Sequence, residues 1–140
     1  MSAPADGLLD TCTVVLLNRF TDPTRLPARP TISTVTLAEL SVGPLVAVSN
    51  QERAARQAHV QQAEDDFDPI PFDAAAARAF GRVAASLRAA GRKPTARALD
   101  ALIAAVAVAN DLPLYTVNPD DFVGIDGLDV RPMAHPGPPD

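Results

Sequence analysis

Short apolar runs alternate with stretches of helical periodicity along the chain. Short apolar or β-branched-rich segments predict strands at residues 7–9, 31–35 and 114–117, and residues 128–130 are expected to form a final edge strand. Helical spacing and capping residues predict helices at 11–18, 36–42, 49–64, 73–90 and 96–110. Because strands and helices alternate, the sequence predicts an α/β fold with a mostly parallel central sheet between helical layers.

Capping residues and prolines indicate where several of these elements begin and end. Asp73 and Thr95 are favourable N-caps for the two long helices that follow them. Gly91 predicts the end of the helix that Asp73 begins, because glycine readily adopts the left-handed backbone of a C-terminal stop. Residues 67–72 contain two prolines, which cannot donate to a sheet ladder, so they predict an extended segment or an edge strand.

Length and composition place the chain among single-domain globular proteins. It has 140 residues, of which 47% are hydrophobic and 21% charged, so it can bury a core. We expect one domain at residues 1–132 and a flexible, proline-rich C-terminal tail at 133–140. The single cysteine, Cys12, excludes a disulfide framework and a multi-cysteine zinc site, and we expect it to be a small buried residue.

Charge and hydropathy exclude several classes of protein. The formal net charge is −5, which argues against a general nucleic-acid coat protein. The uncharged apolar stretch at 101–109 is far shorter than the ~20 residues that a membrane-spanning helix needs. Residues 1–6 do not resemble a signal peptide. We therefore expect a cytoplasmic protein without a membrane partner.

Isolated carboxylates are the most informative chemical feature of the sequence. Asp10, Glu39 and Asp100 are each the only charged residue within an otherwise uncharged, largely apolar stretch. Burying an ionised carboxylate costs several kcal/mol unless it is paired or bound to a metal. These stretches contain no Lys or Arg to pair with the acids, so a shared cation is one way for the acids to coexist.

Each acid also has a simpler explanation. Asp10 can cap the helix that follows it, Glu39 can occupy the exposed face of a short helix, and Asp100 can favour a helix N-terminus. Asp120 and Asp121, which follow the strand at 114–117, can be ordinary turn residues. The joint hypothesis is sharper: acids at the carboxyl edge of the sheet converge on Mg²⁺ or Mn²⁺, which prefer oxygen ligands.

The same residues resemble the signature blocks of PIN-domain proteins, and most closely those of the VapC-type toxins of type II toxin–antitoxin pairs. The blocks are Gly7-Leu-Leu-Asp10-Thr11, Thr36-Leu-Ala-Glu39-Leu40, Leu99-Asp100-Ala-Leu-Ile-Ala-Ala and Thr116-Val-Asn118-Pro-Asp-Asp121-Phe122. The resemblance spans residues 7–130, and four blocks in this order and spacing are specific. It implies a three-layer α/β/α fold, a Mg²⁺- or Mn²⁺-dependent endoribonuclease, a cognate antitoxin and a homodimer.

The resemblance also implies roles for individual residues. Its acidic metal-site residues correspond to four positions of this chain, namely Asp10, Glu39, Asp100 and Asp121. Thr11, Thr116 and Asn118 correspond to polar residues near the site. The chain departs from the family at Cys12, where the family often has Ser, and at Asn118, where related proteins can have an acid. The fourth acid is therefore assigned to Asp121, with Asp120 as a competitor.

Substrate contact requires cations near the acids, because an acidic cluster repels RNA. Residues 74–99 contain no acid and hold half of the Lys and Arg residues of the chain. Arg92, Lys93 and Arg97 are the candidates for RNA binding beside Asp100. The alternative is a solvated helix face followed by a polar turn. His59 and His135 are expected to be surface residues rather than catalysts.

Two other functions remain open at this stage. A haloacid-dehalogenase-like phosphatase also has an Asp at the end of its first strand, but it needs Asp-x-Asp, and this chain has Asp10-Thr11-Cys12. A catalytically silent PIN-fold binding module would bind a partner without cutting RNA. The complete set of acids argues against a silent module, because an idle cluster would retain its electrostatic cost.

Overall fold

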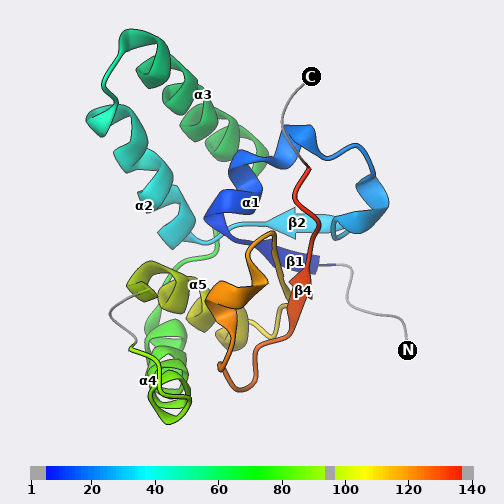
Figure 1. Cartoon of the computed structure of the whole chain (residues 1–140), viewed down its shortest axis with the longest axis vertical. Helices are drawn as coiled ribbons and strands as arrows, with labels where there is room; N and C mark the ends of the chain where they lie inside the picture. Colours follow the sequence, from blue (N-terminus) through cyan, green and yellow to red (C-terminus); the bar gives the residue numbers. More distant parts are fainter. Residues whose placement is uncertain (1–5, 94–96, 137–140) are drawn as a thin grey trace.

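A four-stranded, entirely parallel sheet forms the centre of the molecule, with strand order β2-β1-β3-β4 (Figure 1). The computed structural model describes residues 6–93 and 97–136. The strands are β1 (Asp6–Leu9), β2 (Arg29–Thr31), β3 (Leu114–Thr116) and β4 (Val130–Pro132). The parallel pairing confirms the predicted α/β class, because parallel neighbours need helical crossovers between them.

The two outer strands lie at positions that the sequence does not predict. β2 ends at Thr31, whereas the sequence predicts a strand to residue 35. Ser33 caps a helix instead, and its hydroxyl accepts from the N–H of Thr36 at 3.2 Å. β4 begins at Val130, where the predicted strand ends. Both strands contain a proline, which an edge strand tolerates because one of its sides needs no ladder bonds.

The helices mostly confirm the predicted elements. They are α1 (Thr11–Val15), α2 (Thr34–Val42), α3 (Asn50–Asp66), α4 (Ala74–Ala89) and α5 (Ala98–Ala109). Short 3₁₀ turns are η1 (Leu17–Arg19), η2 (Pro23–Arg25), η3 (Gly43–Val46) and η5 (Pro119–Phe122). Asp73 caps α4 as predicted, and Gly91 follows it with a φ of 78°. The predicted cap Thr95 lies outside the described residues.

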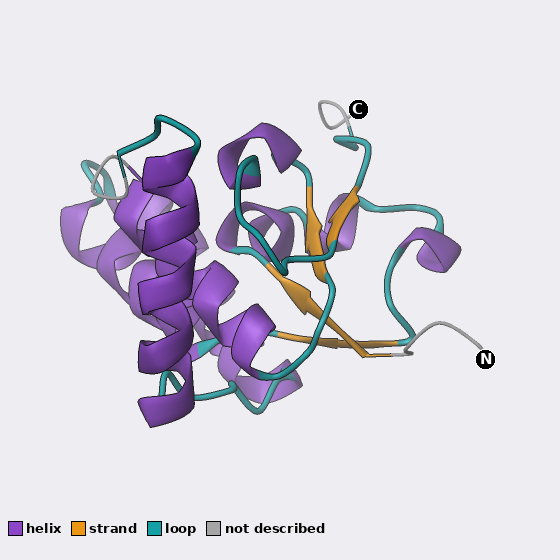
Figure 2. Ribbon diagram, turned by 90° about the horizontal axis from the view of Figure 1, so that it is seen from below, coloured by secondary structure: helices purple, strands orange, loops and turns teal. Residues whose placement is uncertain are grey.

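Two clusters of buried apolar side chains hold the helices against the sheet. Leu8 of β1 and Leu114 of β3 belong to the cluster that contains the buried faces of α4 and α5. Ile32 packs instead with Leu40 of α2 and with the buried residues of α3. Figure 1 shows α2 and α3 on one side of the sheet and α4 and α5 on the other, and Figure 2 shows the strands beside the packed helices. The arrangement is the expected three-layer fold.

Two segments outside the regular strands continue the sheet. The predicted extended segment at 67–72 forms one parallel bridge, between Ile70 and Ser33. Beyond β4, Met133 is buried and its N–H donates to the carbonyl of Thr116 at 2.8 Å, so the packed domain extends past residue 132. Residues 137–140 of the predicted tail lie outside the described residues. None of the helices in the described part of the chain has the length and apolarity of a membrane span.

Candidate active site

The parallel pairing of β1 and β3 brings two chemically important positions to one edge of the sheet. Leu9 is opposite Tyr115, so the next residues along each strand, Asp10 and Thr116, emerge together at the carboxyl ends. This edge is where open α/β sheets collect ligands. The Thr116 hydroxyl donates to Asp10 Oδ2 at 2.6 Å, which joins positions that are 106 residues apart.

Asp10 is buried, with only 3% of its surface exposed, and its carboxylate has three hydrogen-bond donors. Besides the donation from Thr116, Oδ1 accepts from the N–H of Thr13 at 3.1 Å and from the Thr13 hydroxyl. Asp10 is also the N-cap of α1, so the capping explanation holds as well. Because these bonds fix both oxygens, the carboxylate has one defined orientation at the sheet edge.

Thr13 belongs to this arrangement although sequence reasoning did not single it out. Its hydroxyl accepts from the N–H of Val117 at 3.2 Å, just after β3. The Thr116 hydroxyl accepts in the same way from the N–H of Asn118 at 2.9 Å. The signal in the sequence was the spacing of Thr13, three residues after a capping Asp, where the cap accepts from the backbone.

Glu39 lies on α2 and reaches the same region through Thr11. The Thr11 hydroxyl donates to Glu39 Oε1 at 2.8 Å and lies 3.1 Å from the Thr36 hydroxyl. Thr36 is completely buried, whereas Glu39 is half-buried. The first turns of α1 and α2 are thus joined by hydroxyl groups, and Glu39 faces α1 rather than open solvent.

Asp100 and Asp121 come from the first turn of α5 and from η5, and Arg97 lies between them. Arg97 Nη1 is 3.0 Å from Asp121 Oδ1 and 3.9 Å from Asp100 Oδ2. The apolar stretch around Asp100 contains no cation, as the sequence shows, and Arg97 comes from just before it. The chain folds so that the residue three positions before Asp100 turns back toward it. Asp120 is exposed, which favours Asp121 as the fourth acid.

The pKa of Asp100 reflects the other three carboxylates. Burial first, and then the negative charges of Asp121, Glu39 and Asp10, together raise the pKa of this carboxyl from 3.8 to about 6. The guanidinium of Arg97 opposes the shift. A carboxyl with this pKa is partly protonated near neutral pH, because its neighbours and its surroundings both disfavour the charge.

Cys12 lies close enough to the four acids for their charges to act on its thiol. Partial desolvation and then the charges of Asp10, Asp100, Glu39 and Asp121 raise the pKa of its thiol. The side chain is exposed, so the prediction of a buried cysteine is wrong. Cys12 is the second residue of α1, on the side opposite the completely buried Thr13. A raised pKa keeps the thiol protonated and poorly nucleophilic.

The donor chemistry of the site fits a hard divalent cation. Four carboxylates and several hydroxyl groups supply oxygen ligands, the type that Mg²⁺ and Mn²⁺ prefer. Among the described residues, however, no three His, Cys, Asp or Glu side chains lie close enough together to hold a metal ion. Arg97 supplies positive charge at Asp121.

The predicted RNA-binding residues differ in their surroundings. Arg92 Nη1 donates to the carbonyls of Val123 at 2.7 Å and Asp120 at 3.2 Å, and so attaches the end of α4 to η5. Lys93 is exposed. Arg97 is more than half exposed while it pairs with Asp121.

The two histidines line cavities beside the site, His59 together with Glu39 and His135 together with Thr11 and Cys12. His135 is exposed, as predicted, whereas His59 is half-buried on α3.

Comparisons with known proteins agree with this architecture. The sequence matches the PIN domain family over residues 8–128. It is 38% identical over 128 residues to ribonuclease VapC5 of Mycobacterium tuberculosis, covering 90% of this chain and 92% of that protein. It is also 38% identical over 99 residues to ribonuclease VapC4 of the same species, covering 71% of this chain and 73% of that protein.

Solved structures show the same fold. VapBC-5 of Mycobacterium tuberculosis, a member of the VapBC family of toxin–antitoxin systems, matches with a TM-score of 0.81 and 35% identity, over 93% of this chain and 100% of that one. The DNA-bound VapBC of Salmonella typhimurium matches with a TM-score of 0.68 and 26% identity, over 89% and 96% of the two chains. The protein therefore belongs to the PIN-domain family, among the VapC proteins.

Proposed function

We propose that this protein is an endoribonuclease and acts as the toxin of a toxin–antitoxin pair. The observation that supports this most directly is that Asp10, Glu39 and Asp121 lie close enough to Asp100 for their charges to raise its pKa. PIN-domain ribonucleases generally depend on a divalent metal ion. The relatives named ribonuclease VapC and the VapBC structures support the activity and an antitoxin partner.

Four carboxylates would hold the metal, either Mg²⁺ or Mn²⁺. Asp10 and Asp100 are the principal ligands in this proposal, and Glu39 and Asp121 complete the site directly or through water. A bound divalent cation would lower the pKa of a water molecule and neutralise charge on the phosphoryl oxygens. The fit rests on the chemistry of the donors, since all four are carboxylates and positive charge would relieve the repulsion that the other three exert on Asp100.

The residues around the acids position them for this chemistry. Thr13 and Thr116 orient the Asp10 carboxylate through hydrogen bonds to both of its oxygens. Thr11 orients Glu39 in the same manner. Asn118 lies at the mouth of the site, where its N–H fixes the Thr116 hydroxyl. No side-chain nucleophile is required, and the protonated thiol of Cys12 takes no part in the reaction.

Positive charge beside the acids would receive the RNA backbone. Arg97 is placed to contact a phosphate near the scissile bond, since it is exposed and adjacent to Asp100. Lys93 is exposed, and Arg92 supports the η5 segment through its hydrogen bond to the carbonyl of Val123. We further propose a cytoplasmic homodimer that its antitoxin inhibits.

The alternatives considered from the sequence have less support. Family membership removes the haloacid-dehalogenase-like phosphatase, since the PIN domain covers residues 8–128. A catalytically silent module would have no use for three further carboxylates near Asp100 that raise its pKa.

Cleavage of RNA by the purified protein tests the proposal. We expect the wild type to cut single-stranded RNA in millimolar Mn²⁺ or Mg²⁺ and EDTA to stop the reaction. The double variant Asp10→Asn/Asp100→Asn should be inactive, whereas Asp68→Asn, the same change at an exposed acid away from the site, should cut normally. Absence of cleavage by the folded wild type in either metal would contradict the proposal.

Toxicity tests the second half of the proposal. Induced expression of the wild type in bacteria should arrest growth, and expression of the double variant should not. Equal growth with the wild type and the double variant, at equal protein levels, would show that the protein is not a toxin.

A further inference from the structure

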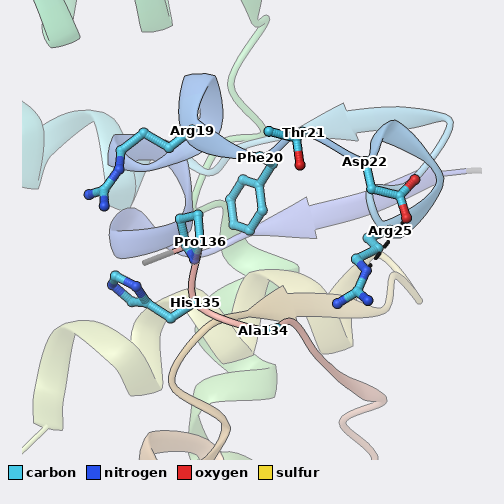
Figure 3. A pocket seen from close by; sticks show the side chains of 8 residues that line it. All are labelled: Arg19, Phe20, Thr21, Asp22, Arg25, Ala134, His135 and Pro136. Carbon is cyan, nitrogen blue, oxygen red and sulfur yellow. Dashed lines mark ion pairs between the residues drawn. The ribbon is translucent and has the colours of Figure 1, made fainter. Parts of the chain in front are cut away.

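A cationic pocket lies away from the four acids, between two segments that are distant in the sequence (Figure 3). One wall is the turn that contains Arg19, Phe20, Asp22 and Arg25, and the other is the segment at His135 that follows β4. We call this the outer pocket. Its cavity volume is about 230 Å³, which is more room than a single ion needs.

The side chains of the outer pocket combine an aromatic ring with guanidinium groups. Figure 3 shows the Phe20 ring at the centre, with Arg19 and His135 on one side and Arg25 on the other. Within the described residues, the guanidinium of Arg19 makes no hydrogen bond or ion pair. Aromatic rings and arginines are the groups on which single-stranded nucleic acids stack and by which their phosphates are held.

Asp22 brings one negative charge to this pocket, but it leaves the donors of Arg25 available. Its carboxylate Oδ1 accepts from the N–H of Thr24 at 3.0 Å and from the Thr24 hydroxyl at 2.5 Å. Arg25 Nε lies 3.6 Å from the other oxygen, and both side chains are at least half exposed. An exposed pair at this distance is weak, and a phosphate can compete for the guanidinium.

His135 connects the outer pocket to the candidate active site. It also lines a second cavity, of about 300 Å³, whose wall includes Thr11, Cys12 and Asn118. Thr11 contacts Glu39, and the charges of all four acids act on Cys12. The two cavities share His135, so the outer pocket adjoins a cavity that Thr11 and Cys12 also line.

We propose that the outer pocket binds a nucleotide of the single-stranded RNA substrate, away from the scissile bond. The base stacks on Phe20, and Arg19 and Arg25 contact the phosphates on either side of it. The proposal rests on the proposed ribonuclease function. The outer pocket would add positive charge to that of Arg97 beside the acids, which a chain of net charge −5 needs in order to hold RNA.

The salt dependence of RNA affinity tests the phosphate contacts. For single strands, each phosphate contact contributes about 0.7 to the slope of log affinity against log salt concentration. Arg19→Ala/Arg25→Ala should therefore lower the magnitude of the slope by about 1.4, measured by anisotropy with a labelled single-stranded 12-mer in EDTA. The matched control is Arg78→Ala/Arg82→Ala, which removes two exposed arginines from α4 and should leave the slope unchanged.

Phe20→Leu tests the stacking contact. Leucine keeps an apolar side chain in the pocket but offers no aromatic face. Affinity should fall by roughly fivefold or more, because stacking of a base on an aromatic side chain contributes a corresponding free energy, while the salt slope stays the same. Circular dichroism and melting temperature will show whether the variant is folded.

The outcomes separate this inference from the function on which it rests. If the wild type neither binds nor cuts RNA, the proposed function itself fails. If the wild type binds RNA but both outer-pocket variants match the α4 control, the outer pocket is not a substrate site and the ribonuclease proposal stands. A weaker slope in the double variant together with full affinity in Phe20→Leu would reduce the pocket to a phosphate contact and overturn nucleotide binding.

Discussion

Asp10 and Asp100 are both isolated acids in apolar stretches, but the fold treats them in opposite ways. Asp10 is 3% exposed and accepts hydrogen bonds from Thr13 and Thr116. Asp100 is partly buried, and its nearest cation is Arg97 at 3.9 Å. Burial and the other three carboxylates raise its pKa to about 6. Hydrogen-bond donors stabilise the Asp10 carboxylate, whereas the neighbouring carboxylates disfavour the charged form of Asp100.

A metal site at this edge would combine two kinds of ligand, a carboxylate fixed by hydrogen bonds and a carboxylate whose pKa is raised. A carboxylate fixed by hydrogen bonds defines where the cation sits, because its geometry exists before binding. A carboxylate with a raised pKa favours binding, because a cation relieves the charge repulsion that the fold imposes. If Asp10 and Asp100 bind the same metal ion, replacing either one should abolish metal binding. The two replacements should nevertheless change the free energy of unfolding of the metal-free protein differently.

The largest expected effect is on catalysis, where replacing Asp10 and replacing Asp100 should have similar consequences. Asp10→Asn and Asp100→Asn should each lower RNA cleavage by more than about 100-fold, since even residues that merely orient metal ligands cost 10- to 100-fold when changed. Initial rates on a labelled RNA at saturating Mn²⁺ give the measurement. If a variant retains more than a tenth of the activity of the Asp68→Asn control, the replaced acid does not belong to the active site.

Metal binding should disappear with either acid. At a Mn²⁺ concentration 100 times the dissociation constant, the wild type should gain about 2.7 kcal/mol in its free energy of unfolding. Differential scanning fluorimetry with and without Mn²⁺ measures the gain, which should be absent in Asp100→Asn and in Asp10→Asn. An unchanged gain in Asp100→Asn would place the metal elsewhere in the molecule.

The comparison also shows why part of the site could be predicted from the sequence. The sequence singles out three isolated acids, namely Asp10, Glu39 and Asp100, because burying an ionised acid in an apolar run costs free energy unless the acid is paired or bound to a metal. The sheet edge followed from strand order, because parallel strands place their carboxyl ends together. Thr13 escaped notice because its role depends on Val117, which is 104 residues away.

Contacts that depend on loop geometry could not be predicted. Arg97 pairs with Asp121 only because η5 folds back over the start of α5, and no local pattern encodes that approach. The end of β2 was misplaced for a related reason. The β-branched residues up to Val35 favour a strand, but the Ser33 cap and the burial of α2 determine the outcome.

Without metal, replacement by Asn should change the free energy of unfolding in opposite directions at Asp10 and at Asp100. Asp10→Asn should lower the free energy of unfolding by about 1–3 kcal/mol, because the amide cannot accept at both of its atoms and the buried Thr116 hydroxyl loses its acceptor. Asp100→Asn should not be destabilising. Chemical denaturation in EDTA at pH 7.5 measures both, and equal destabilisation of the two variants would contradict the distinction.

The smallest effect is the pH dependence at Asp100, and its sign follows from the direction of the pKa shift. The folded protein holds the Asp100 proton up to about pH 6, whereas the unfolded chain releases it near the ordinary value of 3.8. The folded state therefore binds more protons between these values, so this group lowers stability as pH rises from about 4 to about 6.

Asp100→Asn removes that loss, and metal-free Asp100→Asn should become more stable than the wild type by about 1 kcal/mol above pH 6, once solvent screening is allowed for. The advantage should vanish near pH 4, where the wild-type carboxyl is protonated in the folded state. Urea titrations from pH 4 to pH 8 measure the difference, with Asp68→Asn as the control that should follow the wild type throughout. A difference that is constant across this range would mean that Asp100 does not experience the charges of the other acids.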